Sequence, residues 1–392
     1  MRLPCITCGR VEPQTCQNKQ CPYFTTPAKK TLKKDFFGQT PNLFVGRYGY
    51  PNVRVGLLAT EEYADNDDPK KWTAKETSIP EIMDLRSSLI NSQFQANIKD
   101  PRNQLLGQAQ LVAQASKPAE MEVNLEKTPA FRTSYPQGTS PHGASVKLIK
   151  SSITENVRIP QKVDKVINDE LRAQDQLEAL EEEIDEYQLT KLLTSGLLGE
   201  EKTKKLVPTR WGITAVDDSL AKKKLRLVRE QPILNEPTAY FGGHYGNFFC
   251  VLLFNHHWQY ELFEFATGKR SDMKPMTDYE PRSGRTNYAQ ETAGGYYASR
   301  LPVLEHLLKE KRQASALVIR FITDEYTNPL GVWVVREAVR KALESKPVTF
   351  ASQELLIKYA QARMKQFDTD YEFVLNKSKL LKGLRQRTLG DY

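Results

Sequence analysis

The sequence predicts an α+β protein with a small cysteine-rich module at its start, a large mixed α/β domain and a flexible basic tail. Four of the five cysteines fall within the first 21 residues, which contain too few apolar residues for a core. Helix-like and strand-like segments then follow one another without regular β–α–β alternation. Between residues 377 and 387 every charged residue is Lys or Arg. We therefore expect domains at residues 1–28, 29–375 and 376–392.

The four clustered cysteines have the spacing of a zinc ligand set. Cys5 and Cys8 form a CxxC pair, and Cys16 and Cys21 follow after gaps of seven and four residues. Four thiolates can surround one tetrahedral Zn²⁺, whose binding supplies the folding energy that so small a module lacks. Two disulfides are the alternative, but they need an oxidising compartment, and no signal peptide precedes the cluster. With four protein ligands the site is expected to be closed, and therefore structural.

The first half of the large domain shows one strand signal, one helix signal and one loop signal. Residues 42–55 mix aromatics, glycines and a proline, which predicts a short strand and a turn. A helix should begin at Ser78, because its hydroxyl can cap the first turn and Glu81 completes a capping box. The stretch 116–145 is rich in Pro, Ser, Thr and Gly, so we expect a loop-like crossing there.

The second half begins with a helical block, predicted from about residue 161 to 198. Two apolar aromatic runs, 248–254 and 258–265, are joined by Asn-His-His and predict a hairpin. Cys250 lies within the first run and is most simply a buried small hydrophobe. The remaining expected elements are a helix at 302–313, a strand at 316–322 and helices from about residues 331 and 352.

Composition favours a nucleic-acid partner and disfavours several enzyme classes. The 392 residues carry a formal net charge of +8, which suits anionic partners. No apolar run approaches the length of a bilayer span, so we expect a cytoplasmic, nucleoid-associated protein. The sequence has no HExxH, GK[ST], GxSxG or GxGxxG motif, so zinc hydrolases, P-loop ATPases, esterases and dinucleotide-binding enzymes have no support.

The chain ends in a pattern that resembles the PIP motif, by which replication and repair proteins bind the sliding clamp (PCNA type). Gln386, Leu389 and Tyr392 have the required spacing of glutamine, aliphatic and aromatic residues. Leu389 and Tyr392 can enter one hydrophobic pocket from a single helical turn, while Gln386 hydrogen-bonds beside it. The usual motif carries two adjacent aromatics, whereas this chain stops after one. A basic tail without a partner is the alternative.

Longer segments carry a resemblance to a known family. The most specific one reads LVPTRWGITAVDD (206–218), and FVGRYGYP (44–51), DYE (278–280), GGYYASR (294–300) and GVWVVR (331–336) occur in the expected order. With the four-cysteine start, they resemble the archaeal Nre family of DNA-repair proteins over essentially the whole chain. The resemblance implies a zinc finger at the N-terminus, a role in DNA damage repair and a clamp-binding motif at the C-terminus. It implies no established set of catalytic residues.

Two sets of polar residues are candidates for a site in the central domain. Guanidinium groups suit phosphates, and the candidates of this type are Arg47, Arg210, Arg300 and Arg336. Carboxylates hold divalent metals or act as acid and base, and the candidates of this type are Asp217, Asp218, Glu264, Asp278 and Glu280. A cleft that contains both sets suits phosphodiester chemistry. Internal ion pairs among the same residues are the alternative.

The sequence thus predicts a DNA damage repair protein that the sliding clamp recruits and that binds DNA through lysines of the zinc module and the tail. Whether the central domain also processes DNA is left open by the residues. The alternative is a non-catalytic, zinc-containing adaptor for DNA or RNA, because zinc modules of this size also occur in RNA-binding factors. An enzyme for small nucleotides is the least favoured class, since the chain lacks a phosphate-binding loop.

Overall fold

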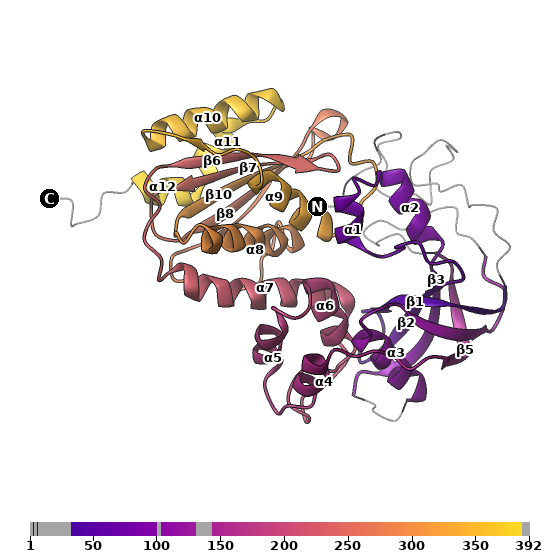
Figure 1. The fold of residues 1–392 in the computed structure, drawn as a ribbon. Helices are drawn as coiled ribbons and strands as arrows, with labels where there is room; N and C mark the ends of the chain where they lie inside the picture. Colours follow the sequence, from indigo (N-terminus) through magenta and orange to yellow (C-terminus); the bar gives the residue numbers. More distant parts are fainter. Residues whose placement is uncertain (1–2, 4–5, 7–32, 100–102, 131–142, 386–392) are drawn as a thin grey trace. The chain divides into compact units, whose positions relative to one another are not determined.

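The computed structural model describes residues 3, 6, 33–99, 103–130 and 143–385. Within this part of the chain the fold divides between Leu220 and Ala221 into two compact units, here called the barrel unit (33–220) and the sheet unit (221–385) (Figure 1). The sequence predicted a single core over 29–375. No Pro-, Gly- or Ser-rich linker marks the division, because one helix, α7 (Thr209–Val228), runs through it.

The barrel unit is built around a closed barrel of five strands. They are β1 (Asp35–Val45), β2 (Asn52–Thr60), β3 (Ile90–Asn97), β4 (Ala119–Leu125) and β5 (Ser145–Ile153). Their order around the barrel is β1-β2-β3-β5-β4, and β4 pairs with β1. β3 and β5 run parallel, whereas the other neighbours are antiparallel. With α3 (Gln104–Gln114) between β3 and β4, this is the connectivity of an OB-fold barrel.

The barrel strands alternate buried and outward-facing side chains, and in β4 the composition of the surrounding sequence made this alternation hard to recognise. The predicted strand and turn at 42–55 are confirmed, since β1 ends at Val45 and β2 begins at Asn52. The predicted loop at 116–145 is wrong for β4. There Ala119, Met121, Val123 and Leu125 are buried while the residues between them face outward, as in any half-buried strand. The surrounding Pro, Ser and Thr residues obscured this period of two.

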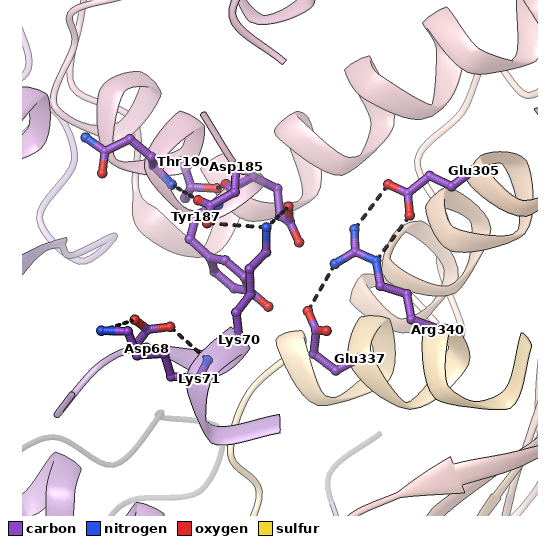
Figure 2. Close-up of polar contacts among 11 residues, drawn as sticks. Asp68, Lys70, Lys71, Asp185, Tyr187, Thr190, Glu305, Glu337 and Arg340 are labelled. Atoms are coloured by element: carbon purple, nitrogen blue, oxygen red, sulfur yellow. Dashed lines mark hydrogen bonds and ion pairs between the residues drawn. The ribbon is translucent and has the colours of Figure 1, made fainter. Parts of the chain in front are cut away.

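Short helices accompany the barrel. They are α1 (Pro69–Ala74), α2 (Ile79–Ser87), α4 (Gln161–Ile167), α5 (Ala173–Leu180) and α6 (Glu186–Thr194). The capping box at the start of α2 is confirmed, because the Ser78 hydroxyl accepts from the Glu81 amide and the Glu81 carboxylate accepts from the Ser78 amide. The predicted block at 161–198 is three helices. Lys70 lies 3.4 Å from Asp185 and so links α1 to α6 (Figure 2).

The sheet unit contains a six-stranded sheet in the order β11-β6-β7-β10-β8-β9. Its strands are β6 (Thr238–His244), β7 (Asn247–Phe254), β8 (Tyr260–Ala266), β9 (Met276–Glu280), β10 (Ser315–Ile322) and β11 (Val348–Thr349), with the short 3-10 helix η2 (Gly268–Arg270) after β8. The predicted strand at 316–322 is confirmed as β10. The predicted hairpin is wrong, because β10 lies between β7 and β8 and pairs with both.

Helices cover both faces of this sheet (Figure 1). One face carries α8 (Gly294–Lys309) and α9 (Trp333–Leu343), and the other carries α10 (Gln353–Gln366), α11 (Tyr371–Lys377) and α12 (Lys379–Arg385). The predicted helix at 302–313 is α8, which begins earlier and contains Pro302. Arg340 on α9 lies 3.1 Å from Glu305 on α8 and joins these two helices (Figure 2).

The basic tail was predicted to begin at residue 376, but the folded part of the chain continues beyond that residue. Residues 379–385 form α12, and Leu380 and Leu381 are buried in the core that β7, β8 and β10 share with α10 and α11. The basic residues of this segment disguised it, because long charged side chains can surround a short buried apolar pair. No helix in the described part of the chain is long and apolar enough to cross a bilayer.

Candidate nucleic-acid interface

Two of the predicted site residues, Glu280 and Arg300, form a buried ion pair in the sheet unit. The Arg300 Nε and Nη2 donate to the Glu280 carboxylate at 2.5 and 2.9 Å. The same carboxylate accepts from the Tyr296 hydroxyl at 2.7 Å and from the Trp258 indole at 3.4 Å, and Glu280 is 0% exposed. Burial raises the pKa of Tyr296 far above its usual value, which keeps this hydroxyl protonated as a donor. This arrangement matches the internal ion-pair alternative.

Asp278 organises the loop between β9 and α8. Its carboxylate accepts from the backbone amides of Gln290, Glu291 and Thr292 and from the Thr292 hydroxyl. Arg285 lies 2.7 Å away on the same carboxylate. Five protein donors therefore surround this carboxylate. Its structural role is to hold residues 285–292 against β9.

Glu264 is also paired within the sheet. Arg320 on the neighbouring strand donates to it at 2.5 Å, and the remaining guanidinium nitrogens donate to the Asn247 side chain. An unpaired carboxylate among the buried side chains of β8 would be costly, and the parallel register of β8 and β10 places Arg320 directly opposite Glu264.

Three further candidate residues, two acids and one arginine, lie on helices. Asp217 and Asp218 are on α7, where Asp217 is fully buried, and Arg336 is buried on α9. Among the residues that the structure describes, no three His, Cys, Asp or Glu side chains are arranged to hold a metal ion. The described geometry does not bring the candidate carboxylates into one open cleft with the candidate arginines.

Arg47 and Arg210 differ from these residues because both are exposed, and both lie at one end of the barrel. Three segments meet there, and we call them the barrel rim: residues 45–54, 97–99 and 205–211. The Ile98 amide donates to the Pro51 carbonyl at 3.0 Å, and the Leu206 amide donates to the Ile98 carbonyl at 2.9 Å. The Val45 amide donates to the Thr209 hydroxyl at 2.8 Å. Hydrogen bonds therefore fix the three segments beside one another.

The turn between β1 and β2 presents aromatic rings at this rim. Gly49 has a φ of +82°, and a Cβ there would come within 2.7 Å of the Asn52 carbonyl oxygen. The turn is closed by the Asn52 amide, which donates to the Gly49 carbonyl at 2.8 Å. The Tyr50 ring lies 5.9 Å from the ring of Trp211 on the first turn of α7. The sharp turn thus holds Tyr50 beside Trp211, and Tyr48 on the same turn is exposed.

The electrostatic character of the rim follows from its sequence. Residues 42–60, 90–99 and 202–216, which form the rim and its flanks, contain no Asp or Glu. The exposed basic residues there are Arg47, Arg54, Lys99, Lys202, Lys205 and Arg210. Within the described chain no ion pair engages Arg47, Arg54, Lys99 or Arg210, so these charges face solvent. The rim is a basic surface with aromatic side chains between the charges.

Sequence reasoning selected Arg47 and Arg210 but missed the rest of the rim. The missed residues are Tyr48, Tyr50, Arg54, Lys99 and Trp211. A signal was available, because GRYGYP and TRWG each place an aromatic next to an arginine. What the sequence could not show is that residues about 160 apart meet, since that depends on how α7 docks against the end of β1.

Comparison with known proteins identifies the family. The family model described as archaeal Nre, N-terminal, matches residues 15–270, and the one described as archaeal Nre, C-terminal, matches residues 280–392. The chain belongs to the archaeal Nre family. The resemblance noted from sequence motifs is therefore confirmed, and Nre proteins of two organisms show its extent.

The Nre relatives cover most or all of the chain. DNA repair protein NreB of Archaeoglobus fulgidus is 33% identical over 403 residues, which span 100% of both chains. DNA repair protein NreA of Haloferax volcanii is 36% identical over 81% of this chain and 80% of its own length. DNA repair protein NreA of Archaeoglobus fulgidus is 36% identical over 83% and 84%, respectively. No solved structure matches this Nre chain.

Two predicted sites of this Nre protein lie outside the described residues. They are the zinc ligands Cys5, Cys8, Cys16 and Cys21, and the clamp-binding residues Gln386, Leu389 and Tyr392.

Proposed function

We propose that this chain is a DNA repair protein that binds DNA through the barrel rim and is recruited by the sliding clamp through Gln386, Leu389 and Tyr392. The names of three relatives supply the link to DNA repair. The observation that carries the DNA-binding part is the rim itself, where exposed basic side chains from three segments gather without a carboxylate among them.

The chemistry of the rim suits a phosphate backbone. Guanidinium groups donate two parallel hydrogen bonds to phosphate oxygens, and Arg47 and Arg210 are exposed for such contacts. Lys99 and Arg54, both exposed, add positive charge in the segments that adjoin the β1–β2 turn. A surface of this kind gains affinity by releasing the counterions that condense on nucleic acid, so binding should weaken as salt rises.

We assign no bond cleavage to the acids of the sheet unit. Glu264, Asp278 and Glu280 already accept hydrogen bonds from buried protein donors, which leaves them poorly placed to hold a metal or to move a proton to substrate. A repair factor that binds DNA and the clamp accounts for this geometry better than a nuclease does.

The four N-terminal cysteines complete the proposal as ligands of a structural Zn²⁺. Thiolates are the ligands that a structural zinc site uses, and the set is closed because all four positions are cysteine. In that role the metal stabilises its own module and takes no part in chemistry at the rim.

Two variants with opposite expected effects test DNA binding and clamp binding separately. We expect the double variant Arg47→Ala/Arg210→Ala to bind a DNA that has both duplex and single-stranded parts about tenfold or more weakly, while a pull-down on the clamp is unchanged. Its plot of log affinity against log salt should be shallower by roughly one unit for each phosphate that the variant no longer neutralises. Deletion of residues 386–392 should have the opposite pattern, with clamp retention abolished and DNA affinity kept.

The matched control is Lys358→Ala/Lys365→Ala, which removes two exposed positive charges from α10 in the sheet unit. It should alter neither activity. If it weakens DNA binding as much as the rim variant does, net charge and not the rim is responsible. If the protein that lacks residues 386–392 is still retained on the clamp, the C-terminal motif is not what binds the clamp.

A further inference from the structure

The barrel rim exposes aromatic rings in addition to its basic side chains, and binding to phosphates would not require these rings. Tyr48 is 80% exposed, Trp211 is 47% exposed and Tyr50 is 45% exposed. In the described chain, the other aromatic rings with comparable exposure are Phe37 and Tyr288, which lie outside the three rim segments in the sequence. Large rings are usually buried, so three of them exposed on one surface indicate a contact surface.

These rings are held in place before any ligand arrives. Tyr50 and Trp211 contact each other at 5.9 Å with their planes tilted by 55°. Hydrogen bonds from Gly46 to Arg54 and from Asn52 to Gly49, both 2.8 Å, fix the turn that carries the tyrosines. The Arg47 guanidinium lies 5.0 Å from the centre of the Tyr48 ring, so the charge and the ring are presented together. A preorganised surface loses little conformational entropy on binding.

The outer face of β2 and β3 continues the surface with groups that can hydrogen-bond. Arg54 lies opposite Gln95, and Asn52 lies opposite Asn97, whose amide donates to the Asn52 side chain at 2.8 Å. All four side chains face outward and are exposed. Amide groups of this kind can pair with the edges of bases that are not engaged in a duplex.

We propose that the barrel rim binds single-stranded DNA, with bases stacked on Tyr50, Trp211 and Tyr48 and the backbone held by the surrounding arginines and Lys99. This inference rests on the proposed DNA binding and adds the form of the substrate. A duplex hides the faces of its bases within the stack, whereas a single strand exposes them to protein rings. Aromatic rings alternating with basic side chains are the combination that single strands require. Barrels of the same connectivity also bind oligonucleotides on strands 2 and 3 and the loop between strands 1 and 2.

The experiment uses the full-length protein with a fluorescein-labelled 15-nucleotide oligo(dT), a 15-base-pair duplex and oligo(rU) of equal length. Wild type should prefer oligo(dT) to the duplex. The variants Trp211→Ala and Tyr50→Ala should each bind oligo(dT) about five- to a hundredfold more weakly, with little effect on the duplex. Trp211→Phe keeps a stacking ring and should retain most of the affinity.

A second readout does not depend on affinity. The chain has four tryptophans, and the three others, Trp72, Trp258 and Trp333, are buried. Oligo(dT) should therefore quench tryptophan fluorescence in wild type and in the control variant Phe37→Ala, which removes an exposed ring from β1 away from the rim. The quench should be absent in Trp211→Phe, even though this variant binds.

The following outcomes would contradict the single-strand site. Unchanged oligo(dT) affinity in Trp211→Ala and Tyr50→Ala, or a wild-type preference for duplex, overturns the single-strand site and leaves the proposed DNA binding intact. Tighter binding to oligo(rU) than to oligo(dT) overturns it in favour of RNA. If wild type binds no DNA in any form, the proposed function fails as well.

Discussion

Glu280 is a polar residue that was a candidate for catalysis and is a structural residue in the fold. Its carboxylate is fully buried and is held by Arg300, Tyr296 and Trp258. Removing one partner of such a pair leaves the other charge buried without compensation, which is far more costly than removing an exposed pair. This contrast separates a structural role from a catalytic one.

We expect Glu280→Ala to lower the free energy of unfolding by roughly 3–5 kcal/mol, measured by denaturant titration, because Arg300 then remains as a buried cation. The control is Glu305→Ala, which removes a partner of Arg340 at a partly exposed pair and should cost about 1 kcal/mol or less. A Glu280→Ala protein of normal stability that has lost a DNA-processing activity would instead point to catalysis.

Single residues were predictable where the signal is local. The Ser78 capping box and the buried Cys250 could be read from their neighbours in the sequence. The partner of Glu264 could not, because Arg320 is 56 residues away and reaches it only through the parallel pairing of β8 with β10. The same limit hid the contact between Tyr50 and Trp211.

At the scale of elements, the start of α12 shows how a strand can fix a helix. Glu261 on β8 accepts from the Ser378 hydroxyl and from the backbone amides of Lys379 and Leu380, the last two at 3.0 and 3.1 Å. It thereby satisfies the free amides at the start of the helix, a role that side chains usually play from within their own segment. Burial raises the pKa of the Glu261 carboxyl, while these donors oppose the rise.

We predict that Glu261→Ala loosens α12, because the amides of its first turn lose their acceptor. Limited digestion with trypsin should then cut at Lys379 and Lys382 several times faster than in wild type. The matched control, Glu372→Ala, changes an exposed carboxylate on α11 and should leave the cleavage rate unchanged. Equal rates in both variants would show that Leu380 and Leu381 hold the helix without the cap.

Elements were predicted well as individual segments and poorly as pairs. Periodicity located β10, α9, α10 and the turn after β1, because those signals repeat within a few residues. It failed for the hairpin, since the runs at 248–254 and 258–265 are adjacent in sequence while β10 separates them in the sheet. Strand order depends on packing between distant segments, which composition does not record.

At the scale of the whole molecule, the family was evident from sequence, whereas the two-unit architecture was not. The motifs quoted from the sequence lie along the whole chain and identify Nre. The closed barrel, however, depends on a parallel pairing of β3 with β5, which begin at Ile90 and Ser145. No local pattern predicts that closure, and with it the meeting of the three rim segments.

The proposed zinc site gives a prediction that involves all five cysteines. Burial raises the pKa of the Cys250 thiol to about 12, so at about pH 8 it has almost no thiolate and should not react. A thiol reagent should therefore modify few cysteines in the zinc-loaded protein, four after treatment with a chelator and all five after denaturation. Circular dichroism should show the central fold intact after chelation. Four reactive thiols before chelation would contradict zinc binding.

The closure of the barrel also limits how copies of this chain can associate. Each of the five barrel strands has a partner on both sides, and only the short pairing of β3 with β5, over residues 91–93 and 145–147, leaves some backbone of these two strands unpaired. The open sheet ends in β11, which has 2 residues, and in β9, which has 5. In the described part of the open sheet, a neighbouring molecule thus finds only two short strand edges to extend, a feature that disfavours edge-to-edge association.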